Sequence, residues 1–311
     1  MPRPSPERLA ELVGGGARVE EITDLGSSHS WTLHRATLAG GREIFVKAAA
    51  ERDGRAGRAG RSGGGVFAAE AAGLRWLAEG GGPEPPVPEV LAADEDLLVL
   101  PWLPPEAPTA GAAERLGREL AALHTASPPA AYGAPWDGFI ADLPLDNTPA
   151  GGEWGPWYAE RRLEPFLRLG AGALGTDGVR LVERVIEEIG VLAGPAEPPS
   201  RIHGDLWSGN VLWTGAEAGG GPGTGGRGML IDPAAHGGHR ETDLAMLALF
   251  GAPYLERVLA AYDEASALAD GWRERVPLHQ LHPLLVHVAL FGAGYRARTV
   301  EAARAALAAA G

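Results

Sequence analysis

The stretch from His203 to Asp243 constrains the fold most, because it sets three oxygen-bearing side chains in a fixed order. Asp205 is followed by four residues and then by Asn210, and Asp232 comes after a further apolar run that is typical of a strand. Magnesium in proteins accepts carboxylate and amide oxygens beside water and phosphate oxygens. Phosphoryl transfer needs mainly such positioned oxygens, and little covalent chemistry from the protein. The spacing therefore predicts a site for Mg²⁺ and the phosphates of ATP.

This order of side chains is typical of enzymes with a protein-kinase-like fold, and it assigns a role to each residue. Asp205 is expected to act as the general base that accepts the proton of an attacking hydroxyl. Asn210 and Asp232 are expected to bind the metal ions that bridge the phosphates. A single Asp-x4-Asn pair would often arise by chance, so the interpretation also depends on the second aspartate and on residues upstream.

Two upstream residues complete the nucleotide site in this interpretation. Lys47 ends a strand-like apolar run, and Glu70 lies near the start of a predicted helix. In kinase-like sites the lysine contacts the α- and β-phosphates and pairs with the helix glutamate. Each residue also has a simpler explanation: a solvated strand end for Lys47, and a surface acid favoured by the helix dipole for Glu70.

Two short segments could contact the rest of the nucleotide. Ser27 and Ser28 lie among small residues between two predicted strands, where backbone N–H groups can approach phosphates, although a plain hairpin turn would look the same. The proline-rich connector 101–105 occupies the place of a hinge. Proline lacks an N–H but keeps its carbonyl, so Pro101 C=O and Leu103 N–H could bind adenine.

The predicted elements fall into two unequal parts, with strands before residue 100 and mainly helices after it. The strands are expected at 17–25, 31–38, 42–48, 89–93, 97–100, 211–213 and 229–231, and the helices at 7–13, 66–79, 111–125, 156–169, 178–193, 243–250, 254–269, 276–291 and 295–310. This order predicts an α+β, two-lobed protein-kinase-like fold, with a small β-rich N-lobe and a larger, mainly helical C-lobe. The expected boundaries are 1–100 for the N-lobe, 101–104 for the hinge and 105–311 for the C-lobe.

Composition narrows the class of protein. The formal net charge of -13 over 311 residues argues against a surface for nucleic acid or anionic membranes, but not against a local ATP site. The chain has no cysteine, which excludes disulfides, thiol nucleophiles and cysteine-bound metals. No signal peptide is recognisable, and no apolar run approaches the roughly 20 residues that span a bilayer. A cytoplasmic enzyme is therefore expected.

Two segments of unusual composition are expected to be loops. Residues 52–61 carry an arginine at every third position among small residues, which could contact an acidic group but more simply form a solvated loop. Residues 215–228 are rich in glycine and join the two strands beside the catalytic residues. Neither segment is given a role in the site.

Four further residues are candidates for support or for acceptor binding. His203 is expected to hold the catalytic loop by hydrogen bonds, because Asp205 already fills the role of base. Asp243 begins an apolar helix, where it is expected to cap the helix and to brace the catalytic loop. Trp207 lies two residues from the base, so its ring is expected near the acceptor hydroxyl. His287 lies on an apolar helix, where a hydrogen-bonded core histidine is the commoner explanation and a substrate contact the alternative.

These motifs closely resemble the fructosamine kinase (ketosamine 3-kinase) family. The resemblance rests on HGDLWSGN at 203–210, IDPAA at 231–235 and GHRETDLAM at 238–246. It extends to Glu153-Trp154 and to Phe291-Gly292 near the C-terminus, and so covers nearly the whole chain. The loop that contains the tryptophan separates this family from aminoglycoside and choline kinases, which share the broader aspartate and asparagine plan.

The resemblance implies an ATP-dependent phosphorylation of the sugar 3-hydroxyl of a ketosamine, which is an amine or lysine that carries a rearranged sugar. The 3-phosphate makes the adduct labile, so the amine is released. The substrate would be a small-molecule or protein-linked ketosamine, with ATP and Mg²⁺ as cofactors. The roles that the resemblance implies are the base for Asp205, metal binding for Asn210 and Asp232, phosphate contacts for Lys47 and Glu70, and sugar contacts for Trp207 and His287.

Two positions depart from the residues usual in the family. His236 stands where Tyr or Phe is common, and Val286 stands before His287 where Asn is common. Both positions are expected on the acceptor side, so they bear on which sugar is bound. The main alternative is another small-molecule kinase of this fold, acting on an aminoglycoside, a choline-like alcohol or another sugar. A scaffold without activity fits less well, because every residue needed for transfer is present.

Overall fold

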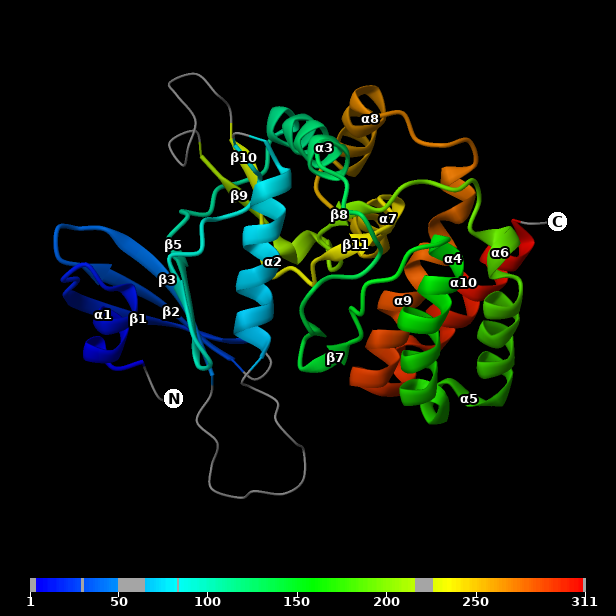
Figure 1. Ribbon diagram of the computed structural model, residues 1–311, viewed down its shortest axis with the longest axis horizontal. Helices are drawn as coiled ribbons and strands as arrows, with labels where there is room; N and C mark the ends of the chain where they lie inside the picture. The colour runs from blue at the N-terminus through cyan, green and yellow to red at the C-terminus, as the bar shows by residue number, and fades with distance from the viewer. Residues whose placement is uncertain (1–3, 29–30, 50–64, 83, 216–225, 310–311) are drawn as a thin grey trace.

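The computed structural model of the protein describes residues 4–28, 31–49, 65–82, 84–215 and 226–309. The arginine-rich segment 52–61 lies outside the described residues, as do residues 216–225 of the glycine-rich connector. Strands come first along the chain and helices follow, as the sequence predicts. Figure 1 shows the sheet at one end of the molecule and most helices at the other, with helix α2 (Val66–Gly80) between them.

A five-stranded antiparallel sheet forms the N-terminal part, in the order β1-β2-β3-β5-β4. Its strands are β1 Val19–Ser28, β2 Trp31–Leu38, β3 Glu43–Ala49, β4 Ala92–Ala93 and β5 Leu97–Pro101. Successive side chains of a strand point to opposite faces. Ile44 and Val46 of β3 therefore pack with Leu9 of helix α1 (Pro6–Val13), whereas Lys47 points to the face where α2 lies.

The C-terminal part is mainly helical. Its helices are α3 Ala110–Thr125, α4 Trp154–Tyr158, α5 Glu164–Glu187, α6 Ile189–Leu192, α7 Glu241–Leu249, α8 Leu255–Ala265, α9 Trp272–Phe291 and α10 Arg296–Ala308, with a π-helical turn at Ala159–Leu163 and 3₁₀ turns at Ser208–Asn210 and Gly292–Tyr295. Short antiparallel strand pairs accompany them: β6 Gly138–Ile140 with β7 Leu143–Leu145, β8 Ser200–Ile202 with β11 His236–Gly238, and β9 Val211–Thr214 with β10 Arg227–Leu230.

Two large apolar cores meet at helix α7. Leu98 of the sheet and Leu120 of α3 belong to one core, and Leu281 of α9 belongs to the other. Helix α7 contributes Leu244 to the first core and Met246 to the second. Because α7 follows the catalytic segment directly in the chain, that segment is held between the two cores.

The helical stretch before the catalytic segment differs from the prediction only in its bounds. The helix expected at 156–169 corresponds to α4, the π-helical turn and the first part of α5, and the helix expected at 178–193 corresponds to the rest of α5 and to α6. Gly175 separates the two parts of α5 in a non-helical conformation, with φ 73°. A Cβ on Gly170 would lie 2.9 Å from Val288 of α9, so this glycine permits close helix packing.

The strands differ from the prediction in smaller ways. Strand β1 continues to Ser28, and the strand expected at 89–93 is only two residues long. The pairs β6–β7 and β8–β11 were not expected, because strands of three residues are too short for an alternating pattern to be visible. Within the described ranges, no helix has the length and apolar character needed to cross a membrane.

Candidate active site

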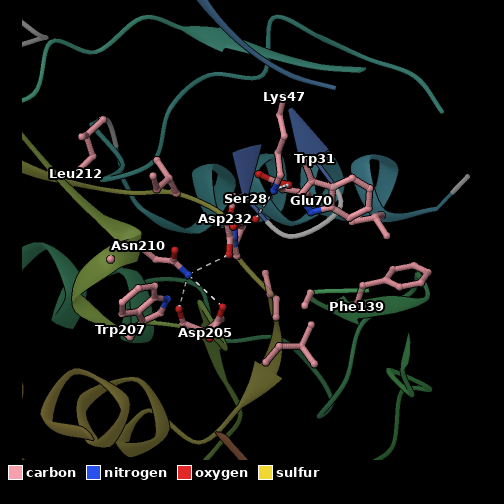
Figure 2. Close-up of a pocket in the computed structure, with 18 of the residues that line it drawn as sticks. Ser28, Trp31, Lys47, Glu70, Phe139, Asp205, Trp207, Asn210, Leu212 and Asp232 are labelled. Atoms are coloured by element: carbon pink, nitrogen blue, oxygen red, sulfur yellow. Dashed lines mark hydrogen bonds and ion pairs between the residues drawn. The ribbon is translucent and has the colours of Figure 1, made fainter. Parts of the chain in front are cut away.

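A cavity of about 780 Å³ lies between the sheet and the helical part. Figure 2 shows Lys47 and Glu70 on one side of it, Asp205 and Asn210 on the other, and Asp232 between them. The residues selected from the sequence that line this cavity are Ser28, Lys47, Glu70, Pro101, Leu103, Asp205, Trp207, Asn210, Asp232 and His287. The fold thus brings together positions from strands, helix α2 and the catalytic segment that lie far apart in the chain.

Lys47 is the centre of a network of ion pairs. Its Nζ lies 2.8 Å from Glu70 Oε2 and 2.6 Å from Asp232 Oδ1, and the Lys47 side chain is only 6% exposed. Burial alone would lower the pKa of Lys47, but the Glu70 and Asp232 carboxylates outweigh burial and raise it. The ammonium is therefore charged and fixed in position. The pairing of Lys47 with Glu70 that the sequence predicts is confirmed.

Asp205 and Asn210 are joined by hydrogen bonds across the turn between them. Asn210 Nδ2 donates to the backbone oxygen of Asp205 at 2.9 Å and to its Oδ2 at 3.1 Å. The amide nitrogen therefore faces Asp205, and the amide oxygen points away from it (Figure 2). Burial, followed by the nearby Asp232 carboxylate, raises the pKa of the Asp205 carboxyl well above its usual range. A raised pKa makes a carboxylate a better acceptor for the proton of a hydroxyl.

The oxygens of Asn210 and Asp232 fit a magnesium site. The Asp232 side chain is 51% exposed to the cavity, and its φ of 57° is a left-handed conformation that aspartate adopts more readily than most residues. Burial would raise the pKa of Asp232, but the Lys47 ammonium outweighs burial and lowers it, so the carboxylate is charged. One or two carboxylates, with room for water and phosphate oxygens, is the protein contribution that Mg²⁺ usually receives.

His203 and Asp243 lie behind the cavity and hold the catalytic segment. Asp243 accepts hydrogen bonds from the backbone N–H groups of His203 at 2.7 Å and Gly204 at 2.9 Å, and its Oδ2 lies 3.1 Å from His124 Nε2. His203 Nε2 donates to the Ile231 carbonyl at 2.9 Å, so the ring links the catalytic segment to the strand that leads to Asp232. Burial lowers the pKa of His203, which keeps its ring neutral.

The expected cap at Asp243 is wrong, although the expected brace is present. Helix α7 begins at Glu241, and its N-cap position, Arg240, makes no capping bond through its side chain. Asp243 therefore lies within the first turn, and its carboxylate turns toward the catalytic segment instead of toward the N–H groups of α7. Asp243 directly precedes the apolar run of α7 in the sequence, which suggested a cap. Its actual partners, the backbone N–H groups of His203 and Gly204, become visible only in the tertiary structure.

Two glycines of the catalytic segment are required by close contacts. Gly204 has φ 79°, and a Cβ there would lie 2.3 Å from the carbonyl oxygen of Ala234. A Cβ on Gly209 would lie 2.2 Å from the Trp207 ring, which therefore lies directly over this glycine. The glycines of the HGDLWSGN motif thus set the backbone that carries Asp205 and the position of the Trp207 ring.

The end of the cavity beside the connector 101–105 is apolar. Pro101 and Leu103 line it, as expected for a hinge. Its other apolar lining residues include Leu25, Leu33, Phe45, Leu100, Trp102, Leu212 and Ile231. Ser28 also lines the cavity, but Ser27 is not among the lining residues, in keeping with the alternation of side chains along β1. Residues 29–30 lie outside the described part of the chain.

Trp207 and His287 line the opposite end of the cavity. Trp207 is 39% exposed, and its ring centroid lies 6.2 Å from that of Phe250, which lies 5.1 Å from that of His287. His287 Nδ1 lies 2.7 Å from the Pro283 carbonyl oxygen. Because a carbonyl only accepts, Nδ1 must donate.

The expectation that His236 lies on the acceptor side is wrong. His236 is buried and is not among the residues that line the cavity. Its Nδ1 donates to the Ala234 carbonyl at 2.8 Å, and its ring lies 5.4 Å from that of Trp157. The departure from the family at this position therefore changes core packing. Val286 is also buried, but it does form part of the cavity wall.

Sequence reasoning gave no role to four aromatic residues that line the cavity: Phe139, Phe250, Phe291 and Tyr295. A signal was present for two of them. His287, Phe291 and Tyr295 are spaced four residues apart, which places them on one side of a helical stretch. The side chain of Phe139 reaches the site through the pair β6–β7, which has no clear sequence pattern.

Comparison with known proteins places this arrangement in a family. Residues 18–309 match the family model described as fructosamine kinase. A probable ketoamine kinase of Thermus thermophilus is 36% identical over 231 residues, which cover 74% of this chain and 79% of that protein. A probable ketoamine kinase of Klebsiella aerogenes is 32% identical over 294 residues, which cover 91% and 92%. A crystal structure from Thermobifida fusca, provisionally assigned as a fructosamine-3-kinase, matches with a TM-score of 0.86 and 51% identity over 97% and 98% of the two chains.

A more distant solved structure supports the fold. A thermostable mutant of an aminoglycoside phosphotransferase matches with a TM-score of 0.60 over 92% of this chain and 95% of its own, at 14% identity. At that identity the likeness concerns the fold alone, and it confirms the two-lobed protein-kinase-like fold expected from the sequence. The family match spans almost the whole chain and includes every residue of the cavity. The chain therefore belongs to the fructosamine kinase family.

Proposed function

We propose that the protein is an ATP-dependent ketosamine 3-kinase, which phosphorylates the sugar 3-hydroxyl of fructosamine or ribulosamine adducts and so promotes deglycation. The observation that carries the proposal is the convergence of Lys47, Asp232 and Asp205 in one cavity of a chain from the fructosamine kinase family. A ternary complex of an aminoglycoside phosphotransferase with ADP and hygromycin B has the same fold, with a TM-score of 0.59, which supports the use of ATP.

In the proposed reaction the sugar hydroxyl attacks the γ-phosphorus, the bond to the β,γ-bridging oxygen breaks, and ADP leaves. Asp205 accepts the proton of the hydroxyl, and its raised pKa favours this transfer. Lys47, held by Glu70, neutralises the α- and β-phosphates. Trp207 covers the acceptor and helps to exclude water, and His287 contacts the sugar.

Magnesium would be held by Asn210 and Asp232, and when bound it would neutralise charge on the phosphates. Asp232 would exchange its contact with Lys47 for the metal, which is compatible with its exposure to the cavity. Pro101 C=O and Leu103 N–H remain our proposal for the adenine contacts. The division into an N-lobe at 1–100, a hinge at 101–104 and a C-lobe at 105–311 also remains a proposal, as does the cytoplasmic location.

The test is ADP release from MgATP with fructosyl-lysine, ribulosyl-lysine, an aminoglycoside and choline as acceptors. The Asp205→Asn variant serves as the blank. We expect turnover with at least one of the two ketosamines, and none with either in the variant. The position of the phosphate on the product is then determined by ³¹P–¹H correlation NMR, with the 3-hydroxyl as the expected site.

Turnover of the aminoglycoside or choline alone would keep the kinase chemistry and discard the ketosamine. This alternative has a specific weakness. Among the described residues that line the cavity, the only carboxylates are those of Glu70, Asp205 and Asp232, all at the phosphate end. An acceptor with several positive charges would find no further acidic partner there.

A further inference from the structure

Helix α7 touches the catalytic segment at both of its ends. Near its start, Asp243 accepts hydrogen bonds from the backbone N–H groups of His203 and Gly204. At its end, Phe250 is the C-cap residue, and its ring centroid lies 6.2 Å from that of Trp207, with an angle of 79° between the ring planes. Such edge-to-face pairs of rings attract each other. The position of Phe250 therefore influences where the Trp207 ring lies.

The end of α7 receives a cation from another helix. The last turn of α7 consists of apolar residues, and Arg298 of α10 donates to its Leu249 carbonyl at 2.6 Å. A cation is favoured at the C-terminal end of a helix, where carbonyls lack partners within the helix. The guanidinium carbon of Arg298 also lies 5.2 Å from the Phe250 ring centroid, within the range of a cation–π contact. One side chain thus fixes both the backbone before Phe250 and the Phe250 ring.

Arg298 can reach the acceptor only through these rings. Phe250 and Trp207 line the cavity, whereas Arg298 is not among the described lining residues. Trp207 is in turn attached to the proposed base, because its backbone N–H donates to the Asp205 carbonyl at 3.1 Å. The residues proposed for the nucleotide lie on the sheet, on α2, on the connector and on the catalytic segment. Their positions do not depend on the contact between Arg298 and Phe250.

We propose that Arg298 is a positioning residue for the acceptor, which fixes Phe250 and thereby holds the Trp207 ring over the acceptor site. This inference rests on the proposed function, in which Trp207 covers the acceptor, and it adds a residue that lies outside the cavity. Loss of Arg298 should therefore impair the use of the acceptor and spare the binding of the nucleotide.

The kinetic test varies fructosyl-lysine, ribulosyl-lysine and MgATP in turn. We expect Arg298→Ala to lower kcat/KM for the ketosamine that the wild type uses by roughly fivefold, with the KM for ATP changed by less than about twofold. Arg298→Lys keeps a cation and a donor and should recover part of the loss. Arg304→Ala removes an exposed arginine of the same helix and should behave as the wild type. An unchanged kcat/KM in Arg298→Ala, or an equal rise in the KM for ATP, would overturn the proposal.

A double-mutant cycle tests whether Arg298 acts through Trp207. In a Trp207→Ala background, adding Arg298→Ala should change kcat/KM for the ketosamine by less than about twofold, because the ring that Arg298 positions is gone. The same loss as in the wild-type background would show that Arg298 acts by another route, and it would overturn the proposal.

A third readout does not depend on turnover. The Trp207→Phe variant keeps the other eight of the nine tryptophans, so its fluorescence subtracted from that of the wild type isolates Trp207. We expect Arg298→Ala to increase the quenching of this difference signal by acrylamide, because the ring loses its support. Unchanged quenching would overturn the proposal. If the wild type phosphorylates neither ketosamine, the proposed function is overturned, and this signal still decides whether Arg298 positions Trp207.

Discussion

Asp205 and Asp232 line the same cavity, but their surroundings give them different proton affinities. Burial, followed by the nearby Asp232 carboxylate, raises the pKa of Asp205, whose carboxylate accepts a hydrogen bond from Asn210. The Lys47 ammonium outweighs burial at Asp232 and lowers its pKa. Two carboxylates whose pKa values are moved in opposite directions suit different roles. The first fits a proton acceptor, and the second a permanently charged metal ligand.

Replacing the proposed base tests the first role. We expect Asp205→Asn to lower kcat by roughly two to four orders of magnitude, because the amide cannot accept the proton of the hydroxyl. The amide oxygen can still accept the bond from Asn210, so folding and ATP binding should persist. Rates by ADP release and affinity by equilibrium ATP binding give the two readouts. Turnover close to wild type would remove Asp205 from the mechanism.

Asp232→Asn tests the second role without adding backbone strain, because asparagine also tolerates the left-handed conformation at φ 57°. Loss of a residue that only orients a metal ligand commonly weakens metal affinity by 10–100-fold, so loss of the ligand's own charge should raise the Mg²⁺ concentration for half-maximal rate by roughly tenfold or more. A magnesium titration at saturating ATP measures the effect. An unchanged half-maximal concentration would contradict the assignment.

Helix α2 is fixed to the helical part at the end remote from Glu70. Arg201 of β8 donates to the Trp76 carbonyl of α2 at 2.6 Å and to the Ser127 carbonyl at 2.8 Å, and its guanidinium lies 4.5 Å from the Trp76 ring centroid. A Cβ on Gly80 would lie 2.3 Å from Arg201, so the helix end and the arginine are in close contact. This anchor links the helix that carries Glu70 to the strand that precedes Asp205.

Removing the Arg201 anchor should weaken the binding of the nucleotide more than the binding of the acceptor. We expect Arg201→Ala to raise the KM for ATP several-fold and to destabilise the protein by about 1–3 kcal/mol, because two carbonyls lose a charged donor. Steady-state kinetics with each substrate varied and chemical unfolding measure the two effects. Arg118→Ala, an exposed arginine on α3, is the matched control and should change neither. Equal increases in the two KM values would argue against an effect through α2.

The stability of the whole molecule depends on buried charged groups that join helices α7 and α9. Glu241 of α7 binds Arg275 of α9 through two hydrogen bonds, at 2.9 and 2.6 Å, and lies 3.2 Å from His279 Nε2. Burial would raise the pKa of Glu241, but His279 and Arg275 outweigh it and lower the pKa to about 2. Burial also lowers the pKa of the neighbouring His239, to about 3.

These two pKa values predict how stability depends on pH. Below about pH 6.5 His239 is protonated in the unfolded chain but stays neutral in the folded chain down to about pH 3. Below about pH 4.5 Glu241 is protonated in the unfolded chain but stays charged in the folded chain down to about pH 2. The free energy of unfolding should therefore fall as the pH falls from 6.5 toward 3, and further toward 2. Urea unfolding across this range measures it. His239→Asn keeps an acceptor for the Glu241 N–H and should reduce the slope between pH 6.5 and 4.5, to which the buried His203, His236 and His282 also contribute; an identical slope would refute the role of His239.

The sequence by itself determined the order of elements and the two-lobed α+β fold, and it selected most of the residues that we propose for the site. Asp205, Asn210 and Asp232 were recognisable because their spacing is set by one short loop and the strand pair β9–β10, and Lys47 because it follows an apolar run that is typical of a strand. Such local patterns can be recognised in the sequence alone. They also predicted the contact of Lys47 with Glu70, since that pair follows from the position of α2 beside the sheet.

The tertiary structure alone decided the contacts that join distant segments. It placed Asp243 within the first turn of α7 instead of at its cap, and it placed His236 in the core. It also brought together at the cavity the rings of Phe250, His287, Phe291 and Tyr295, which come from the residue after α7, from α9 and from the turn after α9. Packing between elements far apart in the chain sets these partners, and no spacing within the sequence records them.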